Sequence, residues 1–195
     1  MGALTERRNP KTADIDLAGA LEIVDLINAE DRTVADAVRA QRAPIAAALT
    51  AAEEVLRAGG RLYYAGAGTS GRLGVLDASE IPPTFGAPPD LVQGIIAGGV
   101  AALTRSQEGA EDRPEGARDD LGQAGVRAGD FVIGIAASGT TPYVRGALER
   151  AAALGARTGI LACSPPASSL LALVDVAILP ITGAEAVTGS TRMKA

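Results

Sequence analysis

The spacing of hydrophobic residues changes near residue 60. Before that point, apolar residues recur at helical spacing, namely Leu17, Leu21, Val24, Ile27, Val34, Val38, Ile45, Leu49 and Val55. Beyond it, short apolar runs alternate with helical stretches, and the runs are 61–65, 92–97, 131–136, 158–163 and 175–179. None of the runs alternates apolar with polar residues, which is typical of parallel strands covered on both faces. The pattern predicts a helical N-terminal segment over 1–58 and, over 59–195, a doubly wound α/β three-layer sandwich with a parallel sheet.

Short signals predict where several helices begin and end. Thr33 and Asp36 have the spacing of a capping box, and the Gly59–Gly60 pair is a stop signal. Thr141 and Pro142 follow the third apolar run and fit the N-cap and first position of a helix. Because proline cannot continue a helix, the pair Pro82–Pro83 predicts that the helix after the first run ends at Glu80.

Composition and charge exclude several classes of protein. The net charge is −5 without a cluster of Lys and Arg, which disfavours a nucleic-acid partner. A single cysteine, Cys163, rules out an internal disulfide framework. There is no apolar run long enough to span a membrane, and the polar N-terminus lacks a signal-peptide pattern. We therefore expect a cytoplasmic protein with no membrane partner.

The sequence contains no histidine. A Ser-His-Asp triad, a Cys-His pair and a histidine metal site are therefore impossible within this chain, and we expect no metal. Any acid–base chemistry must be carried out by carboxylates, Lys or Tyr.

A glycine-rich loop at 66–71 follows the first apolar run and precedes a helical stretch. It matches the dinucleotide fingerprint formally, but the next run ends in Ala97-Gly98-Gly99 without the acid that would bind a ribose. It also lacks the Gly-Lys-Ser/Thr of a P-loop, so no nucleotide cofactor is expected. The remaining interpretations are a phosphate-binding loop and a tight turn without a ligand. A similar loop at 136–142 follows the third run, and both loops could close on one phosphate.

Candidate acids are harder to interpret from pattern alone. Glu80 has the position of a solvated carboxylate at a helix end. The acidic stretch 108–112, which contains Glu111, has the composition of a solvated face. Periodicity therefore leaves the catalytic question open.

Longer strings give a more specific indication. The sequence TERRNP at 5–10, GAGTSGRLGVLDASE at 66–80 and VTGSTRMKA at 187–195 resemble the N-acetylmuramic acid 6-phosphate etherases of the sugar isomerase (SIS) superfamily. Further matching segments are 26–31, 82–86, 95–99, 108–112, 134–139 and 141–144. The resemblance covers about the first two thirds of the family's length, so we expect the chain to be truncated at its C-terminus. Thr140 stands where the family usually has Arg, and Ile81 where Cys is common.

This resemblance implies a function. The family cleaves the D-lactyl ether of N-acetylmuramic acid 6-phosphate to N-acetylglucosamine 6-phosphate and D-lactate, in the recycling of cell-wall amino sugars, without a cofactor. By motif match, Glu111 is the base that removes the C2 proton and Glu80 is the acid that assists lactate departure. The resemblance also implies a homodimer with its site near the interface. The implied phosphate- and sugar-binding residues are Gly68, Thr69, Ser70, Gly71, Ser138, Gly139, Thr140 and Thr141.

Two rival functions share the same superfamily. A non-catalytic sensor of sugar phosphates, like the related glucokinase regulatory proteins, would keep the loops and need neither carboxylate. An aldose–ketose phosphate isomerase would use C2 deprotonation but has no leaving group to protonate. Retention of both Glu80 and Glu111 within matching strings favours the etherase.

Overall fold

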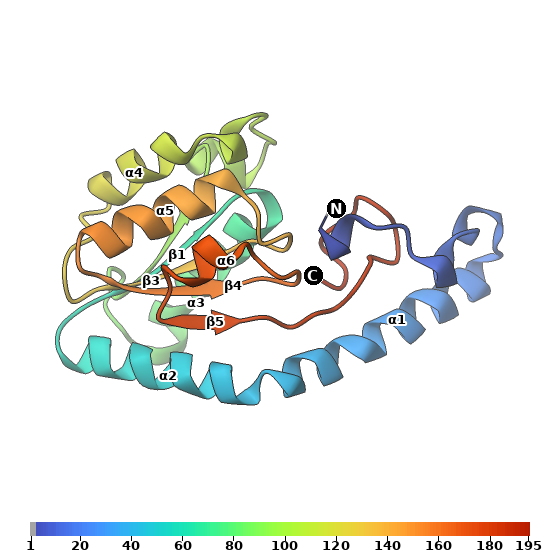
Figure 1. Ribbon diagram of the computed structural model, residues 1–195, viewed down its shortest axis with the longest axis horizontal. Helices are drawn as coiled ribbons and strands as arrows, with labels where there is room; N and C mark the ends of the chain where they lie inside the picture. The colour runs from blue at the N-terminus through green and yellow to red at the C-terminus, as the bar shows by residue number, and fades with distance from the viewer. Residues whose placement is uncertain (1–2) are drawn as a thin grey trace.

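A five-stranded parallel sheet forms the centre of the computed structural model, which describes residues 3–195 (Figure 1). The strands are β1 (Leu62–Gly66), β2 (Val92–Ile96), β3 (Phe131–Ile135), β4 (Arg157–Leu161) and β5 (Val176–Ile178). Their order across the sheet is β2-β1-β3-β4-β5, and every neighbouring pair is parallel. Each strand falls on one of the apolar runs, so the predicted parallel sheet is confirmed.

Helices cover both faces of this sheet. They are α1 (Ala20–Ala40), α2 (Arg42–Arg57), α3 (Gly68–Phe85), α4 (Pro114–Gln123), α5 (Pro142–Ala153) and α6 (Ser168–Leu171). Helices α4 and α5 pack together on one face, whereas α2 and α3 lie on the other (Figure 1). The three-layer sandwich is thus confirmed, and α1 extends beyond it. The predicted division of the chain into two units near residue 58 stays a prediction. Helix α2, which precedes that position, packs directly on the sheet.

Two apolar clusters fill the spaces between the layers. Tyr63, Val132 and Leu148 belong to the cluster beneath α4 and α5, and all three are fully buried. Val55 and Phe131 belong to the cluster that faces α2 and α3. Because the strands are buried from both sides, no polar face has to alternate with an apolar one, which explains the continuous apolar runs.

Two predicted helix boundaries are wrong. Helix α1 runs through Thr33, whose hydroxyl donates to the Glu30 carbonyl at 2.7 Å instead of capping a new helix. Helix α3 continues past Glu80 and through the proline pair, which occupies its last turn. The two prolines cannot donate to the carbonyls one turn earlier, at residues 78 and 79, so two hydrogen bonds are lost in that turn. The helix ends at Phe85, and Gly86 is its C-cap, where a left-handed backbone (φ 64°) lets the Gly86 N–H donate to the Pro82 carbonyl.

The two ends of the described chain lie side by side (Figure 1). The Thr5 N–H donates to the Ser164 hydroxyl at 3.2 Å, and the Thr12 hydroxyl donates to the Ala186 carbonyl at 2.7 Å. The N-terminal segment, residues 3–17, is built from short 3₁₀ turns: Leu4–Glu6, Pro10–Thr12 and Ile15–Leu17. These contacts bring residues from both ends of the sequence to one side of the sheet.

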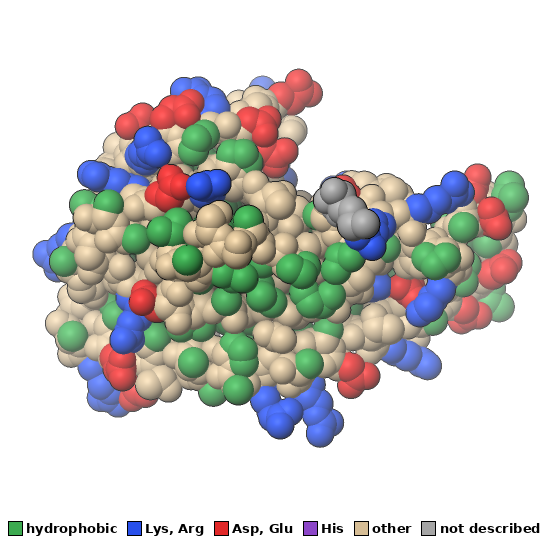
Figure 2. Space-filling view, viewed as in Figure 1, with side chains coloured by type: hydrophobic (Ala, Val, Ile, Leu, Met, Phe, Trp, Pro, Cys, Tyr) green, Lys and Arg blue, Asp and Glu red, His purple; other side chains and the backbone are tan. Residues whose placement is uncertain are grey.

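The surface in Figure 2 carries charged side chains of both signs along its edges, whereas apolar side chains gather near β5 and the segment that follows it. Among the helices of residues 3–195, none combines the length and apolar character that crossing a membrane requires.

Candidate functional site

A cavity of about 520 Å³ opens at the carboxyl ends of β1 and β3. These two strands are neighbours, with Gly66 paired to Ile135, and the chain proceeds from them toward opposite edges of the sheet. In doubly wound folds such a switch point is where the loops diverge and leave a crevice for a ligand. The volume lies in the range of small-molecule sites in proteins.

The first wall of the cavity is the loop that leads from β1 into α3. Ala67 is the N-cap residue of α3, and no side chain caps this end of the helix. The free N–H groups of the first turn therefore remain available to an anion. Gly71 allows the helix to start this close to the sheet, because a Cβ atom there would lie 2.6 Å from Ile96 Cγ1 and 2.7 Å from the Gly66 carbonyl oxygen.

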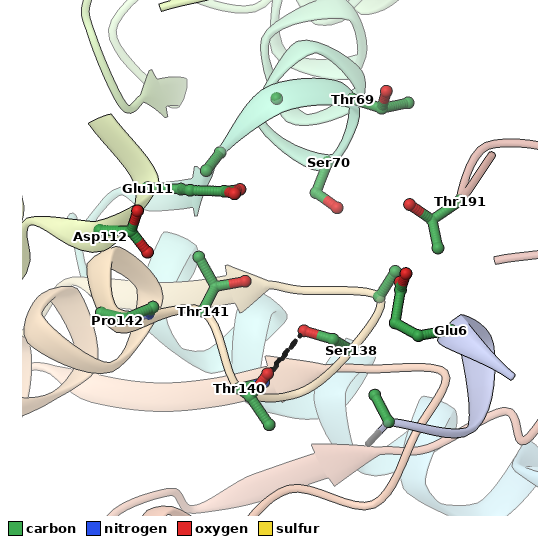
Figure 3. Close-up of a pocket in the computed structure, with 14 residues that line it drawn as sticks. Glu6, Thr69, Ser70, Glu111, Asp112, Ser138, Thr140, Thr141, Pro142 and Thr191 are labelled. Atoms are coloured by element: carbon green, nitrogen blue, oxygen red, sulfur yellow. Dashed lines mark hydrogen bonds between the residues drawn. The ribbon is translucent and has the colours of Figure 1, made fainter. Parts of the chain in front are cut away.

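The second wall is the loop that leads from β3 into α5. Thr141 is the N-cap residue and Pro142 is the first helical residue, as predicted, but the Thr141 hydroxyl makes no capping hydrogen bond. It points into the cavity instead (Figure 3). The hydroxyls of Ser138 and Thr140 lie 3.0 Å apart, and the Thr140 N–H donates to the Ser138 oxygen at 3.2 Å. The loop thus presents a cluster of hydroxyls at a second helix N-terminus.

Carboxylates surround these hydroxyls. Glu111 and Asp112 come from the 3₁₀ turn Ala110–Asp112, which lies between β2 and α4. The loop ahead of this turn is tied to α3 by Arg72, whose Nε donates to the Ala102 and Leu103 carbonyls at 3.0 and 3.1 Å. Glu6 enters the cavity from the N-terminal segment (Figure 3).

Among the described residues, 3–195, no Lys or Arg side chain lines the cavity. An anion held here would depend on hydroxyls and on the partial positive charge of the α3 and α5 N-termini. In the same 3–195 range, no three acidic or thiol side chains are grouped closely enough to ligate a metal ion.

Most of the predicted site residues meet in this cavity. Those that line it are Gly68, Thr69, Ser70, Glu111, Ser138, Thr140 and Thr141. Gly71 and Gly139 do not line the cavity themselves. At Gly139 the backbone packs closely, since a Cβ atom there would come within 2.8 Å of the Ser164 carbonyl oxygen. Their roles in binding and catalysis stay predictions.

Glu80 is the predicted residue that the structure places elsewhere. It is exposed on the last third of α3 and does not line the cavity of its own chain. At a rise of about 1.5 Å per residue, twelve positions separate it from the helix start by about 18 Å. The two acids that the resemblance assigns to one reaction, Glu80 and Glu111, therefore do not share a pocket within a single chain.

Sequence reasoning missed Glu6, Asp112 and Thr191 as lining residues. Asp112 was hidden inside an acidic stretch that has the pattern of a solvated face. Glu6 and Thr191 belong to strings that match the etherase family, but 185 positions separate them and no periodicity connects them.

Comparison with known proteins decides the family. A family model described as the glucokinase regulatory protein N-terminal SIS domain matches residues 44–152, more than half of the chain. The chain belongs to the SIS-domain family.

Curated relatives of this SIS domain carry a more specific name. The N-acetylmuramic acid 6-phosphate etherase of Symbiobacterium thermophilum is 56% identical over 192 residues, which are 98% of this chain and 63% of that protein. The etherase of Cronobacter sakazakii is 51% identical over 195 residues, or 100% of this chain and 65% of the relative. The resemblance seen in the sequence is confirmed, and the chain spans slightly less than two thirds of these relatives.

Solved structures support the fold of the SIS domain. Phosphoheptose isomerase from Neisseria gonorrhoeae superposes with a TM-score of 0.60 at 18% identity, covering 82% of this chain and 84% of that one. Phosphoheptose isomerase from Francisella tularensis superposes with a TM-score of 0.61 at 20% identity, covering 80% of this chain and 84% of that one.

A buried ion cluster lies beside the cavity of this SIS domain. Glu30 of α1 accepts hydrogen bonds from Lys194 at 2.6 Å, Asn9 at 2.8 Å and Lys11 at 2.9 Å. The side chains of Glu30 and Lys194 are each only 4% exposed. Burial alone would raise the pKa of Glu30, but the hydrogen bonds from Lys194, Lys11 and Asn9 outweigh it and lower the pKa to about 2.

The same cluster fixes the two chain segments that complete the cavity. Lys194 also donates through its backbone N–H to Glu185 at 3.0 Å, and its ammonium group reaches the Ala184 carbonyl at 3.1 Å. Thr191 lies three positions before Lys194, and Glu6 lies three positions before Asn9. The Glu30 cluster therefore anchors both segments close to their cavity-lining residues.

Proposed function

We propose that the cavity binds N-acetylmuramic acid 6-phosphate and that the protein cleaves its D-lactyl ether. One observation carries the proposal: two hydroxyl-bearing loops at helix N-termini meet the carboxylate of Glu111 in one cavity. The printed names of relatives 51–56% identical to the chain support the same reaction. Because those relatives are longer, the activity of the whole protein is part of the proposal. Recycling of cell-wall amino sugars in the cytoplasm is its proposed setting.

The proposed chemistry needs only carboxylates. Opening the sugar ring exposes an aldehyde at C1, which makes the C2 proton acidic. Glu111 removes that proton, the C3–oxygen bond breaks, and the lactyl oxygen takes a proton from an acid as D-lactate leaves. Water then adds across the C2–C3 double bond, with hydroxyl at C3 and a proton at C2. Ser70, Ser138, Thr140 and Thr141 are the proposed phosphate ligands.

The position of Glu80 favours a homodimer in this mechanism. On α3, Leu73, Leu76 and Glu80 follow the i, i+3, i+7 spacing of one helix face, and the two leucines are 53% and 57% exposed. An apolar helix face of this kind is a common site of association between identical chains. We propose that a second subunit covers this face and that Glu80 supplies the acid to the cavity of its partner.

Subunit mixing tests this arrangement. Glu80→Gln and Glu111→Gln chains are each expected to be inactive alone, whereas an equal mixture should recover about a quarter of the wild-type rate, because half of the dimers are mixed and each mixed dimer holds one complete site. The rate of D-lactate release after mixing is the measurement. The same mixture would remain inactive if both acids had to come from one chain, and that result would contradict the shared site.

The reaction itself is tested with N-acetylmuramic acid 6-phosphate as substrate. We expect stoichiometric release of D-lactate and N-acetylglucosamine 6-phosphate without added metal or nucleotide, measured by an enzymatic lactate assay. Tight binding of the phosphosugar without lactate release would instead support a sugar-phosphate sensor. Conversion of an aldose phosphate to a ketose phosphate would support an isomerase.

A further inference from the structure

Glu6 is a third carboxylate in the cavity, and the mechanism above does not use it. It comes from the N-terminal 3₁₀ turn Leu4–Glu6, far in sequence from both hydroxyl loops. Figure 3 shows its carboxylate directed into the cavity from the side opposite Glu111, with Ser70 and Ser138 between them. The two carboxylates therefore face the same space from different walls.

The backbone beneath Glu6 is held firmly in place. Thr5 is fully buried, and its N–H donates to the Ser164 hydroxyl at 3.2 Å. Asn9 is also buried and is held by Glu30 and by the Ala184 carbonyl. The N-terminal segment is thus anchored on both sides of Glu6, which favours a defined position for its side chain.

The carboxylate of Glu6 makes little contact with the other described residues. It makes no ion pair with any residue in the range 3–195. Its one hydrogen-bond contact there is the hydroxyl of the adjacent Thr5, at the long distance of 3.5 Å. Within this range Glu6 thus neither pairs with a cation nor caps a helix, although exposed arginines follow it directly in the sequence. Its carboxylate oxygens are therefore open to a donor in the cavity.

Electrostatics restricts which part of a phosphosugar can lie next to Glu6. A phosphate beside it would be repelled, since both groups are negative and the cavity lining described here offers no cation to separate them. Sugar hydroxyls and an amide N–H are neutral donors, and a carboxylate is purely an acceptor. Glu111 and Asp112 also repel a phosphate, but only the two loops offer hydroxyls and helix N-termini to offset that repulsion. The phosphate is therefore favoured at the loops, and the hydrogen-bond donors of the sugar are favoured at Glu6.

We propose that Glu6 accepts hydrogen bonds from the hydroxyl or amide donors of the bound sugar and so selects a phosphosugar over phosphate alone. This inference rests on the proposed function, because it assumes that the cavity holds a sugar phosphate. It assigns to the N-terminal segment the recognition of the sugar, while the two loops recognise the phosphate.

The experiment compares two probes on the whole chain, N-acetylglucosamine 6-phosphate and inorganic phosphate, by calorimetric titration or competition. Glu6→Gln is expected to weaken binding of N-acetylglucosamine 6-phosphate about tenfold or more, as for loss of a charge-assisted hydrogen bond. Binding of inorganic phosphate should stay within about twofold or become tighter, since a repelling charge is removed. Glu22→Gln, at an exposed site on α1, is the matched control and should change neither affinity.

The outcomes separate this inference from the proposed function. If the wild-type chain does not bind N-acetylglucosamine 6-phosphate, both the function and the inference fail. If the wild-type chain binds it, the inference alone is overturned when Glu6→Gln weakens the binding of both probes equally or changes the binding of neither. Glu6→Asp, which keeps the charge on a shorter side chain, should lose affinity for the sugar phosphate but not for phosphate.

Discussion

Replacing Glu111 by Gln is expected to abolish D-lactate release and, in the same variant, the exchange of the substrate's C2 proton with solvent deuterium. Both steps depend on removal of that proton, and an amide cannot accept it. Loss of a positioned general base costs about 10²–10⁴-fold in rate. Lactate release is followed by an enzymatic assay, and proton exchange by NMR in deuterium oxide.

Two other acids, Asp112 and Glu80, serve as controls for the role of Glu111. Asp112→Asn alters the adjacent carboxylate of the same cavity and should leave C2 exchange largely intact. Glu80→Gln should suppress lactate release and still allow exchange, because the carbanion forms before the leaving group departs. If Glu111→Gln retained exchange and Glu80→Gln lost it, the roles of the two acids would be reversed.

Replacing Lys194 by Met is expected to lower the free energy of unfolding by about 3–5 kcal/mol, because it leaves Glu30 buried without its closest charged partner. Both side chains of the pair are nearly inaccessible, and their oxygen and nitrogen lie 2.6 Å apart. Urea unfolding followed by circular dichroism measures the change. Glu30→Gln should also destabilise the chain, since it leaves the Lys194 ammonium group unpaired.

Lys11 provides a matched control for Lys194. It contacts the same Glu30 carboxylate at 2.9 Å, but its side chain is 68% exposed. Exposed ion pairs contribute about 1 kcal/mol or less, so Lys11→Met should be nearly neutral. If Lys11→Met and Lys194→Met lowered the free energy of unfolding equally, burial would not determine how much each ion pair stabilises the fold.

The pH dependence of stability follows from the same group. The pKa of Glu30 is lowered from 4.5 to about 2 in the folded chain. Its stabilising contribution is therefore complete above pH 4.5 and is lost as the pH falls toward 2. Removing Lys194 should flatten this part of the acid-unfolding curve.

The sheet could be predicted from sequence because its determinants are local. Each buried strand is a continuous apolar run, and glycine-rich or polar segments separate the runs. The hydroxyl loops were also predictable, since a parallel sheet brings the carboxyl ends of β1 and β3 to one edge. Position in the chain was thus enough to place Ser70 and Thr141 together.

The remaining features of the site depend on contacts that sequence spacing does not reveal. Pro82 and Pro83 are typical helix breakers, yet they are accommodated in the last turn of α3, so the end of that helix was misplaced. The pattern around Glu80 fits a solvated helix-end carboxylate, and the structure shows it exposed and not lining the cavity, whereas the family resemblance alone assigned it to the site. The segment that carries Glu6 is held by long-range contacts, among them those of Asn9 and Lys194 with Glu30, and a buried ion pair across 164 positions leaves no periodic trace.

The anchoring of the two chain ends has a consequence for the order in which the protein becomes competent to bind. Thr5 is synthesised 159 positions before its partner Ser164, and Glu30 is synthesised 164 positions before Lys194. The sheet itself needs only residues up to Ile178, where β5 ends. The N-terminal wall of the cavity depends on a contact with residue 194, which is made later than the sheet. We therefore expect the cavity to take its described form only after the segment around Lys194 has been synthesised and has met Glu30.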